Sequence, residues 1–282
     1  MITIKNITDL AQVYDYQMRF PAPYFFPVDF ACWLRSFTQD IDGEGRFLFR
    51  DLRAMVAYDG DAIVGFVQYG LTAFGFDAQG EISSGVSYPV IRSLYFDKGR
   101  EDAGQLLLQA ALEAFTAWDR VYAFFHYFGM SCFARHGKLF EEFPWIGALL
   151  RQNGFQVEHE NVYYSATLTE QSDAAITLRE QDVTAGNQQV FDFTLDGRQV
   201  GGCEVHYVTA GIAYLRWIYV NGELQSRGIG TLCMRALKAF LSQKGHVRLD
   251  TDTALNNHVA QRFYEKTGFS REGVTRSYYR DR

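Results

Sequence analysis

The stretch YVNGELQSRGIGTLCMRAL, residues 219–237, joins the end of a strand-like segment to the start of a helix-like one. A strand-like apolar run ends near Val220, and a helical pattern begins directly after two closely spaced glycines, Gly228 and Gly230. The first N–H groups of a helix have no partner within the helix and carry a partial positive charge. Small residues let an anion approach such a backbone, and Arg227 adds a charged donor. The stretch therefore predicts a pyrophosphate-binding loop between a strand and a helix.

Two other glycine-rich motifs are excluded at this loop. A dinucleotide-binding fingerprint requires a third glycine where Cys233 stands. A Walker loop requires a lysine directly before its Ser or Thr, but Gly230 precedes Thr231. What remains is a strand, a short loop and a helix that together present backbone donors to an anion.

The composition indicates an ordinary globular protein that is long enough for two domains. Of its 282 residues, 48% are hydrophobic and 21% are charged. The formal net charge of −6 argues against a nucleic-acid or anionic-membrane partner, because such binders depend on clustered Lys and Arg. An anionic ligand must therefore be held by a local site.

The cysteines and the N-terminus point to the cytoplasm. The four cysteines have no paired spacing, so neither a disulfide framework nor a zinc site is expected. The start MITIKNITDL lacks the basic and apolar regions of a signal peptide, and no apolar run approaches the ~18 residues of a membrane span. We expect a soluble, cytoplasmic protein without a membrane partner.

The first half of the chain reads as two helices followed by strands and a further helix. Thr8 and Asp29 are candidate caps of the two helices, and Asp59-Gly60-Asp61 is a hairpin turn. The expected elements are helices at 7–20 and 28–37, a hairpin at 55–70, a strand at 90–96, a helix at 102–118 and a strand at 121–128.

The second half repeats this order without the two opening helices. Its expected elements are a hairpin at 190–208, a strand at 212–220, a helix at 228–244, a strand at 246–252 and a helix with a glycine cap at 256–269. The segments 92–95 and 216–219 align, as do 151–155 and 265–269. We interpret the repeat as a diverged duplication, with its boundary in the small and polar stretch TLTEQSDAAITL, residues 167–178.

The loop and a second motif together resemble the GNAT superfamily of acyl-CoA-dependent N-acyltransferases. The resemblance runs from the block 220–230 to Asn257-x-x-Ala260-x-x-Phe263-Tyr264-Glu-Lys-x-Gly268-Phe269, in the family's order and spacing. It implies an α/β (α+β) fold of two tandem GNAT-like domains, each a mixed twisted sheet flanked by helices. Residues 1–168 would be a degenerate domain that serves as scaffold and supplies acceptor-site helices, and residues 174–282 would be the acetyl-CoA-binding domain.

The resemblance also implies acetyl-CoA as the co-substrate, with no metal. The loop would hold the pyrophosphate, and backbone groups of the preceding strand would pair with the pantetheine arm. The residues expected to bind acetyl-CoA are Ile218, Tyr219, Val220, Gln225, Ser226, Arg227, Gly228, Ile229, Gly230, Thr231, Asn257 and Tyr264.

The implied reaction is transfer of an acetyl group to a primary amine by direct attack in a ternary complex. A backbone N–H of the strand would polarise the thioester carbonyl, and Tyr264 would protonate the departing thiolate. Glu204 and His206 lie two residues apart, on one face of a strand, and are candidate bases outside the family motif, although a water chain would serve equally. The acceptor would be a small-molecule amine or a protein amine.

The first half departs from the family pattern where acetyl-CoA would bind. Its corresponding loop, Arg100-Glu-Asp-Ala103-Gly-Gln105, has two acidic residues and no Gly-x-Gly, and Leu150 occupies the tyrosine position. We infer that the first domain has lost acyl-CoA binding.

Three alternatives stay open at this point. His126, Cys132 and His136 could be metal ligands, but their spacing is weak and no metal is expected. The aromatic and proline cluster at 20–27, with Trp33, either lines an acceptor pocket or packs in a core. The whole chain could instead be a non-catalytic acyl-CoA-binding regulator or scaffold, which needs the loop but no acid or base.

Overall fold

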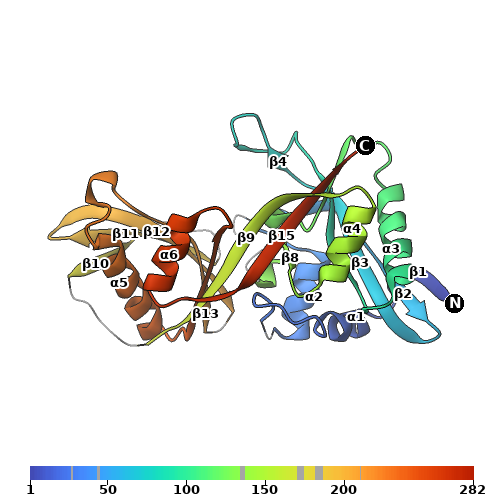
Figure 1. The fold of residues 1–282 in the computed structure, drawn as a ribbon, viewed down its shortest axis with the longest axis horizontal. Coiled ribbons are helices and arrows are strands. Elements are labelled where there is room, and N and C mark those ends of the chain that lie inside the picture. Colours follow the sequence, from blue (N-terminus) through green and yellow to red (C-terminus); the bar gives the residue numbers. More distant parts are fainter. Residues whose placement is uncertain (27, 43–44, 134–136, 170–174, 182–186, 210) are drawn as a thin grey trace. The chain divides into compact units, whose positions relative to one another are not determined.

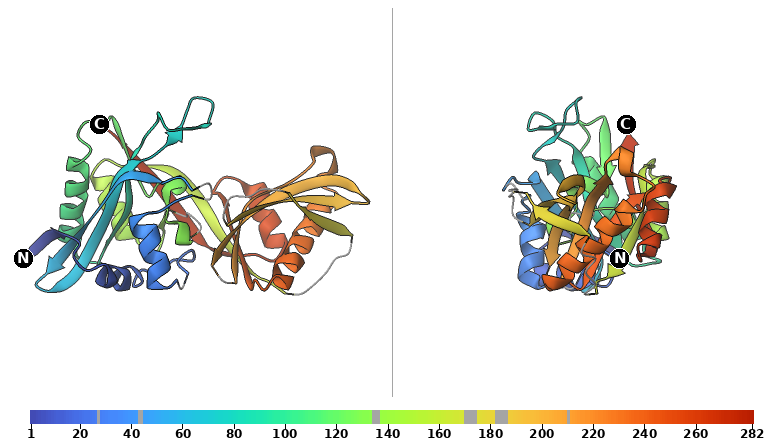
Figure 2. Two further views of the ribbon diagram at one scale, coloured as in Figure 1. Left: turned by 180° about the vertical axis from the view of Figure 1, so that it is seen from behind. Right: turned by 90° about the vertical axis from the view of Figure 1, so that its left-hand side faces the viewer.

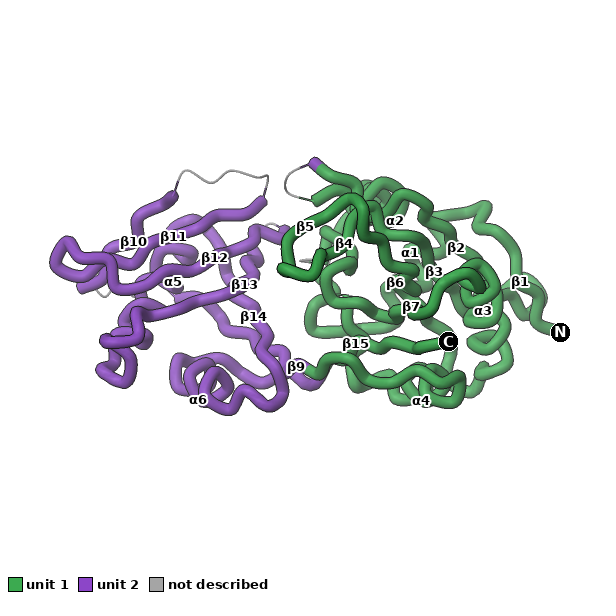
Figure 3. Tube along the Cα trace, turned by 90° about the horizontal axis from the view of Figure 1, so that it is seen from above, with its two compact units in different colours: residues 1–42, 46–160, 275–282 green, residues 43–45, 161–274 purple. Residues whose placement is uncertain are grey.

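The chain forms two compact units (Figure 3). The computed structural model describes residues 1–26, 28–42, 45–133, 137–169, 175–181, 187–209 and 211–282. Unit 1 consists of residues 1–42, 46–160 and 275–282, and unit 2 consists mainly of residues 161–274. Strands and helices occur in both units (Figures 1 and 2), so the expected mixed α/β fold is confirmed.

The sheet of unit 1 is mixed. In spatial order its strands are β1 (Ile2–Asn6), β2 (Phe49–Asp59), β3 (Ala62–Thr72), β6 (Pro89–Phe96), β7 (Arg120–Ala123), residues 275–281 of β15 (Ser270–Asp281) and residues 156–160 of β9 (Gln156–Thr167). Strands β6 and β7 are parallel, while the pairs β1–β2, β2–β3, β3–β6 and β15–β7 are antiparallel. Short strands β4 (Gly75–Phe76) and β5 (Ile82–Ser83) form a separate pair, and β8 (Leu139–Phe140) adds to β15.

Helices lie on both faces of the unit 1 sheet. The ring of Phe66 in β3 contacts Tyr16 of α1 (Leu10–Gln17), whereas a Cβ on the adjacent Gly65 would lie 2.9 Å from Leu107 of α3 (Glu101–Glu113). Because adjacent strand residues face opposite ways, α1 and α3 cover opposite faces. Helix α2 (Phe30–Thr38) contacts α1, and α4 (Pro144–Gln152) contacts α3. None of the described helices is long and apolar enough to cross a bilayer.

The two opening helices are capped by aspartates. The Asp29 carboxylate accepts the Cys32 N–H at 2.7 Å, as predicted for α2. Helix α1 was expected to use Thr8, but Asp9 is its cap, with its carboxylate accepting the Ala11 N–H at 3.0 Å. A carboxylate also interacts favourably with the positive end of the helix dipole, which a threonine hydroxyl does less well.

The aromatic cluster at residues 20–26 belongs to the core of unit 1. Tyr24, Phe26 and Trp33 are almost fully buried, and the Trp33 ring stacks on Phe37 with centroids 4.5 Å apart. Core packing is therefore confirmed for the described part of this cluster, while Pro27 lies outside the described residues. The role of α1 and α2 beside an acceptor stays a prediction.

Unit 2 has the same sheet plan with helices on one face. Its strands are β10 (Ile176–Glu180), β11 (Gln188–Leu195), β12 (Arg198–Thr209), β13 (Ile212–Val220), β14 (Arg248–Ala254), residues 161–167 of β9 and residues 270–274 of β15. Helices α5 (Ile229–Gln243) and α6 (His258–Lys266) share one core with alternate strand residues such as Cys203, Val205 and Leu215. The described residues between 161 and 221 contain no helix, in agreement with the predicted lack of opening helices.

The two units match at the ends of α4 and α6, which supports the duplication. Both helices end at a glycine with positive φ, 84° at Gly154 and 83° at Gly268. In both, the N–H of the next phenylalanine donates a hydrogen bond to a carbonyl near the end of the helix. The Phe155 N–H donates to Leu150 at 3.1 Å, and the Phe269 N–H donates to Tyr264 at 3.0 Å. This is the glycine-terminated cap that the sequence predicted.

The compact units do not coincide with the expected ranges 1–168 and 174–282. The division falls within β9, between residues 160 and 161, and within β15, between residues 274 and 275. Each sheet is completed by a strand segment from the other half of the chain: Tyr278 pairs with Ala123 in unit 1, and Ala254 pairs with Asn161 in unit 2. A polar linker in the sequence cannot reveal such an exchange of strands.

Candidate active site

The first feature of the candidate site is a pair of parallel strands that part. Strands β13 and β14 pair from Ile212 with Arg248 to Leu215 with Thr251, and no described pair follows. The Thr251 hydroxyl donates to the Leu215 carbonyl at 2.9 Å at this last rung. The rest of β13 therefore has a backbone edge that β14 does not cover.

The peptide groups of Ile218 and Val220 point to this open edge. The N–H of Asn221 donates to the Val200 carbonyl of β12 at 2.9 Å. Because peptide groups alternate between the two edges of a strand, Tyr219 also bonds toward β12, while Ile218 and Val220 face the other way. Tyr219 was expected to bind with them, but its own peptide groups are directed to β12.

The predicted loop follows at the end of the same strand. Ser226 and Gly228 have positive φ values of 61° and 82°, and Gly228 is the N-cap of α5 without any side-chain cap. Within the described part of the chain, no hydrogen bond is made by the N–H groups of residues 226–230. Unbonded donors at a helix N-terminus attract an anion, as the sequence predicted.

Neighbouring side chains shape this loop. The Gln225 amide donates to the Val220 carbonyl at 3.0 Å, so this side chain ties the loop to the open strand. A Cβ on Gly230 would lie 3.2 Å from the Phe263 ring of α6, so a larger residue would disturb the packing of α5 and α6. The Thr231 N–H is used in the turn, where it donates to Gly228 at 3.0 Å, and only its hydroxyl is left for a ligand. Arg227 is exposed and forms no ion pair with a described residue.

Tyr264 lies at the base of the parting strands. Its side chain is 6% exposed. Burial raises the pKa of its hydroxyl, a hydrogen bond with Thr251 lowers it and the nearby charge of Asp252 raises it, with a net increase. Since Thr251 forms the last rung between β13 and β14, this protonated hydroxyl lies where the open edge begins.

Asn257 caps α6. Its carbonyl oxygen accepts the Ala260 N–H at 3.2 Å, and its amide donates to the Thr253 hydroxyl at 3.2 Å. Both polar groups are therefore engaged within the protein. The predicted contact between Asn257 and acetyl-CoA stays a prediction.

Glu204 and His206 are brought together on the helix-free face of β12. Their neighbours Cys203 and Val205 lie in the core, so Glu204 and His206 face the opposite way. The His206 Nε2 atom lies 2.6 Å from Glu204 Oε1, and the Trp217 indole donates to Glu204 Oε2 at 2.6 Å. Burial would raise the pKa of Glu204, but His206, Arg216 and Trp217 lower it overall, which keeps the carboxylate ionised.

Comparisons with known proteins identify the family of the stretch that contains this candidate site. Residues 155–269 match the model of the acetyltransferase (GNAT) family. These residues form a GNAT acetyltransferase domain. The domain includes the β9 segment 161–167, which belongs to unit 2 although it precedes the expected boundary.

Relatives agree with this assignment. A protein of Bacillus subtilis (strain 168), provisionally named a ribosomal protein bS18-alanine N-acetyltransferase, is 27% identical over 86 residues, which are 30% of this chain and 56% of that protein. The match thus spans little more than half of the relative's length. A tandem GNAT protein from the clavulanic acid biosynthesis pathway has 14% identity, a TM-score of 0.64, and coverage of 100% of this chain and 98% of its own.

A third similar structure is the glucosamine N-acetyltransferase region of a fungal multi-domain β-N-acetylglucosaminidase. It has 12% identity and a TM-score of 0.67, and the match covers 99% of this chain and 38% of that protein. At such identities the likeness shows the fold alone. Together with the tandem protein it confirms the predicted fold of two GNAT-like domains.

The corresponding place in unit 1 is filled by a side chain. The Asp97 N–H donates to the Val64 carbonyl at 3.0 Å, so by alternation the carbonyl of Phe96 faces the open edge of β6. The Trp145 indole of α4 donates to this carbonyl at 3.0 Å. Position 145 corresponds to Val259 in the GNAT domain, and the Val259 side chain is 71% exposed.

The start of α3 in unit 1 also differs from that of α5. Its first turn contains the exposed carboxylates Glu101 and Asp102, and Arg100 pairs with Asp102 at 3.2 Å and with Asp59 at 2.8 Å. An anion would meet negative charge here, and the nearby arginine is already engaged.

Two residues of the helix-free face were not predicted from the sequence. Trp217 orients Glu204, and Asp252 accepts the Tyr214 hydroxyl at 2.6 Å. The alternation of Leu249, Asp250, Thr251 and Asp252 in a strand could have placed Asp252 on that face. Nothing in the sequence alone could have placed the Trp217 indole against Glu204, because β12 and β13 shift register between Glu204 and Val205.

Proposed function

We propose that this protein is an N-acetyltransferase that moves an acetyl group from acetyl-CoA to a primary amine by direct attack in a ternary complex. One observation carries the proposal: the unbonded N–H groups of residues 226–230 follow directly after the open backbone edge of Ile218 and Val220. The first group of donors fits a pyrophosphate, and the second fits an amide-bearing arm, such as pantetheine. Acetyl-CoA contains both.

The residues of the domain fit the steps of acyl transfer. The Ile218 N–H faces the open edge and is a candidate donor to the thioester carbonyl oxygen as its negative charge grows. The C–N bond forms at this carbon as the C–S bond breaks. Tyr264 is placed to give its proton to the departing sulfur, since its raised pKa keeps it protonated at neutral pH.

A proton must also leave the attacking amine. The ionised Glu204, in contact with His206, is the candidate acceptor for this proton. Trp217 and Tyr219, with centroids 5.9 Å apart, are partly exposed near this carboxylate. A carboxylate beside aromatic faces suits a cationic amine, and the name of the Bacillus relative also gives an amine acceptor.

Charge reversal at the loop tests the acetyl-CoA site. We expect Arg227→Glu to weaken acetyl-CoA binding by about 10- to 100-fold in calorimetry, because a charged hydrogen bond contributes about 1.5–3 kcal/mol. Arg198→Glu makes the same charge change at another exposed residue of unit 2 and should leave the affinity unchanged. Equal affinities for the wild type and Arg227→Glu would contradict the assignment of the loop.

The acceptor is found by assaying a panel of amines for release of free thiol from acetyl-CoA. The panel should contain polyamines, aminoglycosides, amino acids and peptides with free N-termini. We expect amine-dependent thiol release with at least one class. Tight acetyl-CoA binding without transfer to any amine would instead favour a non-catalytic acyl-CoA-binding protein.

A further inference from the structure

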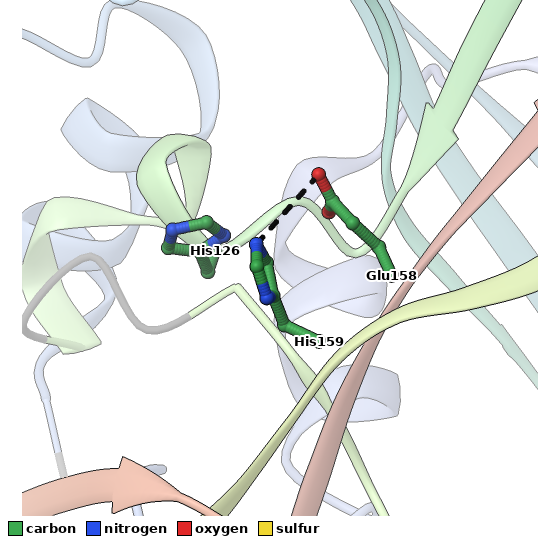
Figure 4. A group of neighbouring side chains, drawn as sticks. All are labelled: His126, Glu158 and His159. Atoms are coloured by element: carbon green, nitrogen blue, oxygen red, sulfur yellow. Dashed lines mark ion pairs between the residues drawn. The ribbon is translucent and has the colours of Figure 1, made fainter. Parts of the chain in front are cut away.

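We propose that unit 1 binds a divalent transition-metal ion through His126, Glu158 and His159. One ligand atom from each of these side chains lies within 4.8 Å of the other two. Figure 4 shows the three side chains as neighbours, with the ion pair between Glu158 and His159 marked. All three belong to unit 1, so the proposal uses no residue of the candidate acetyl-CoA site and does not depend on the proposed function.

Two different parts of the fold supply the ligands. His126 begins a short 3-10 turn (His126–Phe128) after β7, and Glu158 and His159 are consecutive residues of β9. The imidazole centroids lie 5.0 Å apart with perpendicular rings, and His159 Nε2 lies 4.0 Å from Glu158 Oε1. His126 and Glu158 are too far apart in sequence to form a recognisable metal-binding motif, whereas Cys132 and His136 lie close to His126 in the sequence.

The ligand atoms lie within 4.8 Å of one another and must move closer together to bind one ion. Metal–nitrogen bonds of about 2.0–2.1 Å in a tetrahedral site place ligand atoms about 3.4 Å apart. The His159 side chain is 55% exposed, so its ring can rotate toward the other two without disturbing the core. The exposed side of the site leaves a fourth position for water.

The surroundings of Glu158 favour a bound cation. Its side chain is only 19% exposed, and within the described residues no Lys or Arg nitrogen lies within 4.0 Å of it, although the charges of Arg120 and Lys138 act on it from farther away. The Ser277 hydroxyl donates to Glu158 Oε2 at 3.0 Å, which orients the carboxylate and leaves Oε1 on the side of His159. Such an outer hydrogen bond to a ligating carboxylate is common in metal sites.

The donor set selects the kind of ion. Two imidazoles and one carboxylate suit Zn²⁺, Ni²⁺ or Cu²⁺, whereas Ca²⁺ and Mg²⁺ prefer oxygen ligands. Cys132 does not contribute, because it is not part of the cluster and burial raises the pKa of its thiol to about 12. His136 lies outside the described residues.

Titration of the chelator-stripped full chain with Zn²⁺ tests the proposal. Calorimetry should detect one tight equivalent, and Mg²⁺ at the same concentration should give no signal. His159→Gln and His126→Gln should each weaken Zn²⁺ binding at least tenfold. His258→Gln, at an exposed histidine of α6, makes the same substitution elsewhere and should change nothing.

Cobalt supplies an independent readout. Co²⁺ bound to this donor set should give visible absorption that His159→Gln abolishes. Because His159 is exposed, this variant should fold normally, which circular dichroism can verify even if His126→Gln does not fold. Absence of a tight equivalent in the wild type, or Zn²⁺ binding and Co²⁺ spectra unchanged by His159→Gln, would overturn the proposal.

Discussion

A single side chain distinguishes two otherwise equivalent positions at the ends of α4 and α6. Leu150 and Tyr264 accept the same cap hydrogen bond, from Phe155 and Phe269, and both side chains are buried. Only Tyr264 has a hydroxyl, and this hydroxyl reaches Thr251 at the last rung between β13 and β14. The backbone was thus retained in both units while the functional group is present in one.

Replacement of Tyr264 by Phe should lower turnover without much effect on acetyl-CoA binding. We expect kcat to fall about 100-fold, because a positioned general acid commonly contributes at least that factor. The acetyl-CoA affinity should stay within about twofold, because the aromatic ring remains. Steady-state kinetics and calorimetry measure the two quantities separately.

Tyr164→Phe is the matched control. Its ring lies 5.6 Å from that of Tyr264, and its hydroxyl donates to Glu265 rather than to Thr251. It should therefore leave kcat nearly unchanged. A Tyr264→Phe enzyme as fast as the wild type would remove the acid role of Tyr264.

A second residue-scale prediction concerns Asp250, which is fully buried in unit 2. Burial raises its pKa to about 6, against the opposing effects of Arg248 and Tyr163. The unfolded chain, with a pKa near 3.9, binds fewer protons at this residue between about pH 4 and 6, so this carboxylate makes stability fall as the pH rises through that window. Asp250→Asn should remove this contribution.

The free energy of unfolding of the wild type and Asp250→Asn, measured in urea at several pH values, checks this prediction. Relative to the variant, the wild type should lose about 2 kcal/mol between about pH 4 and pH 7, since one pKa unit corresponds to 1.36 kcal/mol and the unfolded carboxyl is already half ionised near pH 4. A difference that stays constant, or grows in the opposite direction, would contradict the raised pKa.

At the scale of elements, hydrophobic periodicity predicted most helices and strands of the two units. The periodicity predicted the wrong end for one strand, where the backbone turns, and missed two strands whose sequences are polar. The strand expected at 121–128 ends at Ala123, because Phe124 adopts a φ of 53° and the chain turns into a short 3-10 helix. Strands β9 and β15 were missed because their sequences, QVEHENVYYSAT and SREGVTRSYYRD, are rich in polar residues, and that of β15 also in charged ones.

The loop of the candidate site was predictable, because its motif fixes the backbone conformation. Side-chain positions that depend on tertiary contacts were not predictable. The glycines of the loop predict its conformation, because Gly228 has a φ of 82° that other residues rarely adopt. The Trp145 indole on Phe96 is different, since no sequence rule tells which side chain fills the edge of a strand. Loss of the loop was visible in the sequence of the first half, but closure of the strand edge was not.

Removal of the Trp145 indole from the edge of β6 in unit 1 should not create a second acetyl-CoA site. Trp145→Val introduces the residue found at the equivalent position 259 and leaves the Phe96 carbonyl without its donor. We expect a loss of about 1–3 kcal/mol in stability, because a buried acceptor loses its partner. The stoichiometry in calorimetry should stay at one, because Glu101 and Asp102 still repel an anion. Binding of a second equivalent would contradict the degeneracy of unit 1.

At the scale of the whole molecule, the duplication was readable from two pairs of aligned segments, but the exchange of strands was not. Composition identified a polar stretch at 167–178 as a linker, whereas the compact units divide inside β9 and β15. Both strands run unbroken across the division, and the nearest glycine, Gly273 of β15 with a φ of 148°, lies inside the strand and does not end it. Only the register, with Tyr278 on Ala123 and Asn161 on Ala254, reveals which unit each segment completes.

The exchange predicts that the last residues of the chain stabilise a distant part of unit 1. Deletion of residues 275–282 removes the strand that pairs with β7, including the nearly buried Tyr278 and the Asp281 carboxylate that binds Arg120 at 2.6 Å. Amide hydrogen exchange in residues 120–123, followed by mass spectrometry, should become much faster than in the full chain, because unpaired backbone groups exchange freely.

Deletion of residues 1–6 is the matched control, since it removes an edge strand that pairs with β2 only and should leave exchange at β7 unchanged. If the truncated chain is insoluble, Tyr278→Ala in the full chain should accelerate exchange in the same peptide. Full protection of residues 120–123 in both variants would show that β15 does not complete the sheet of unit 1.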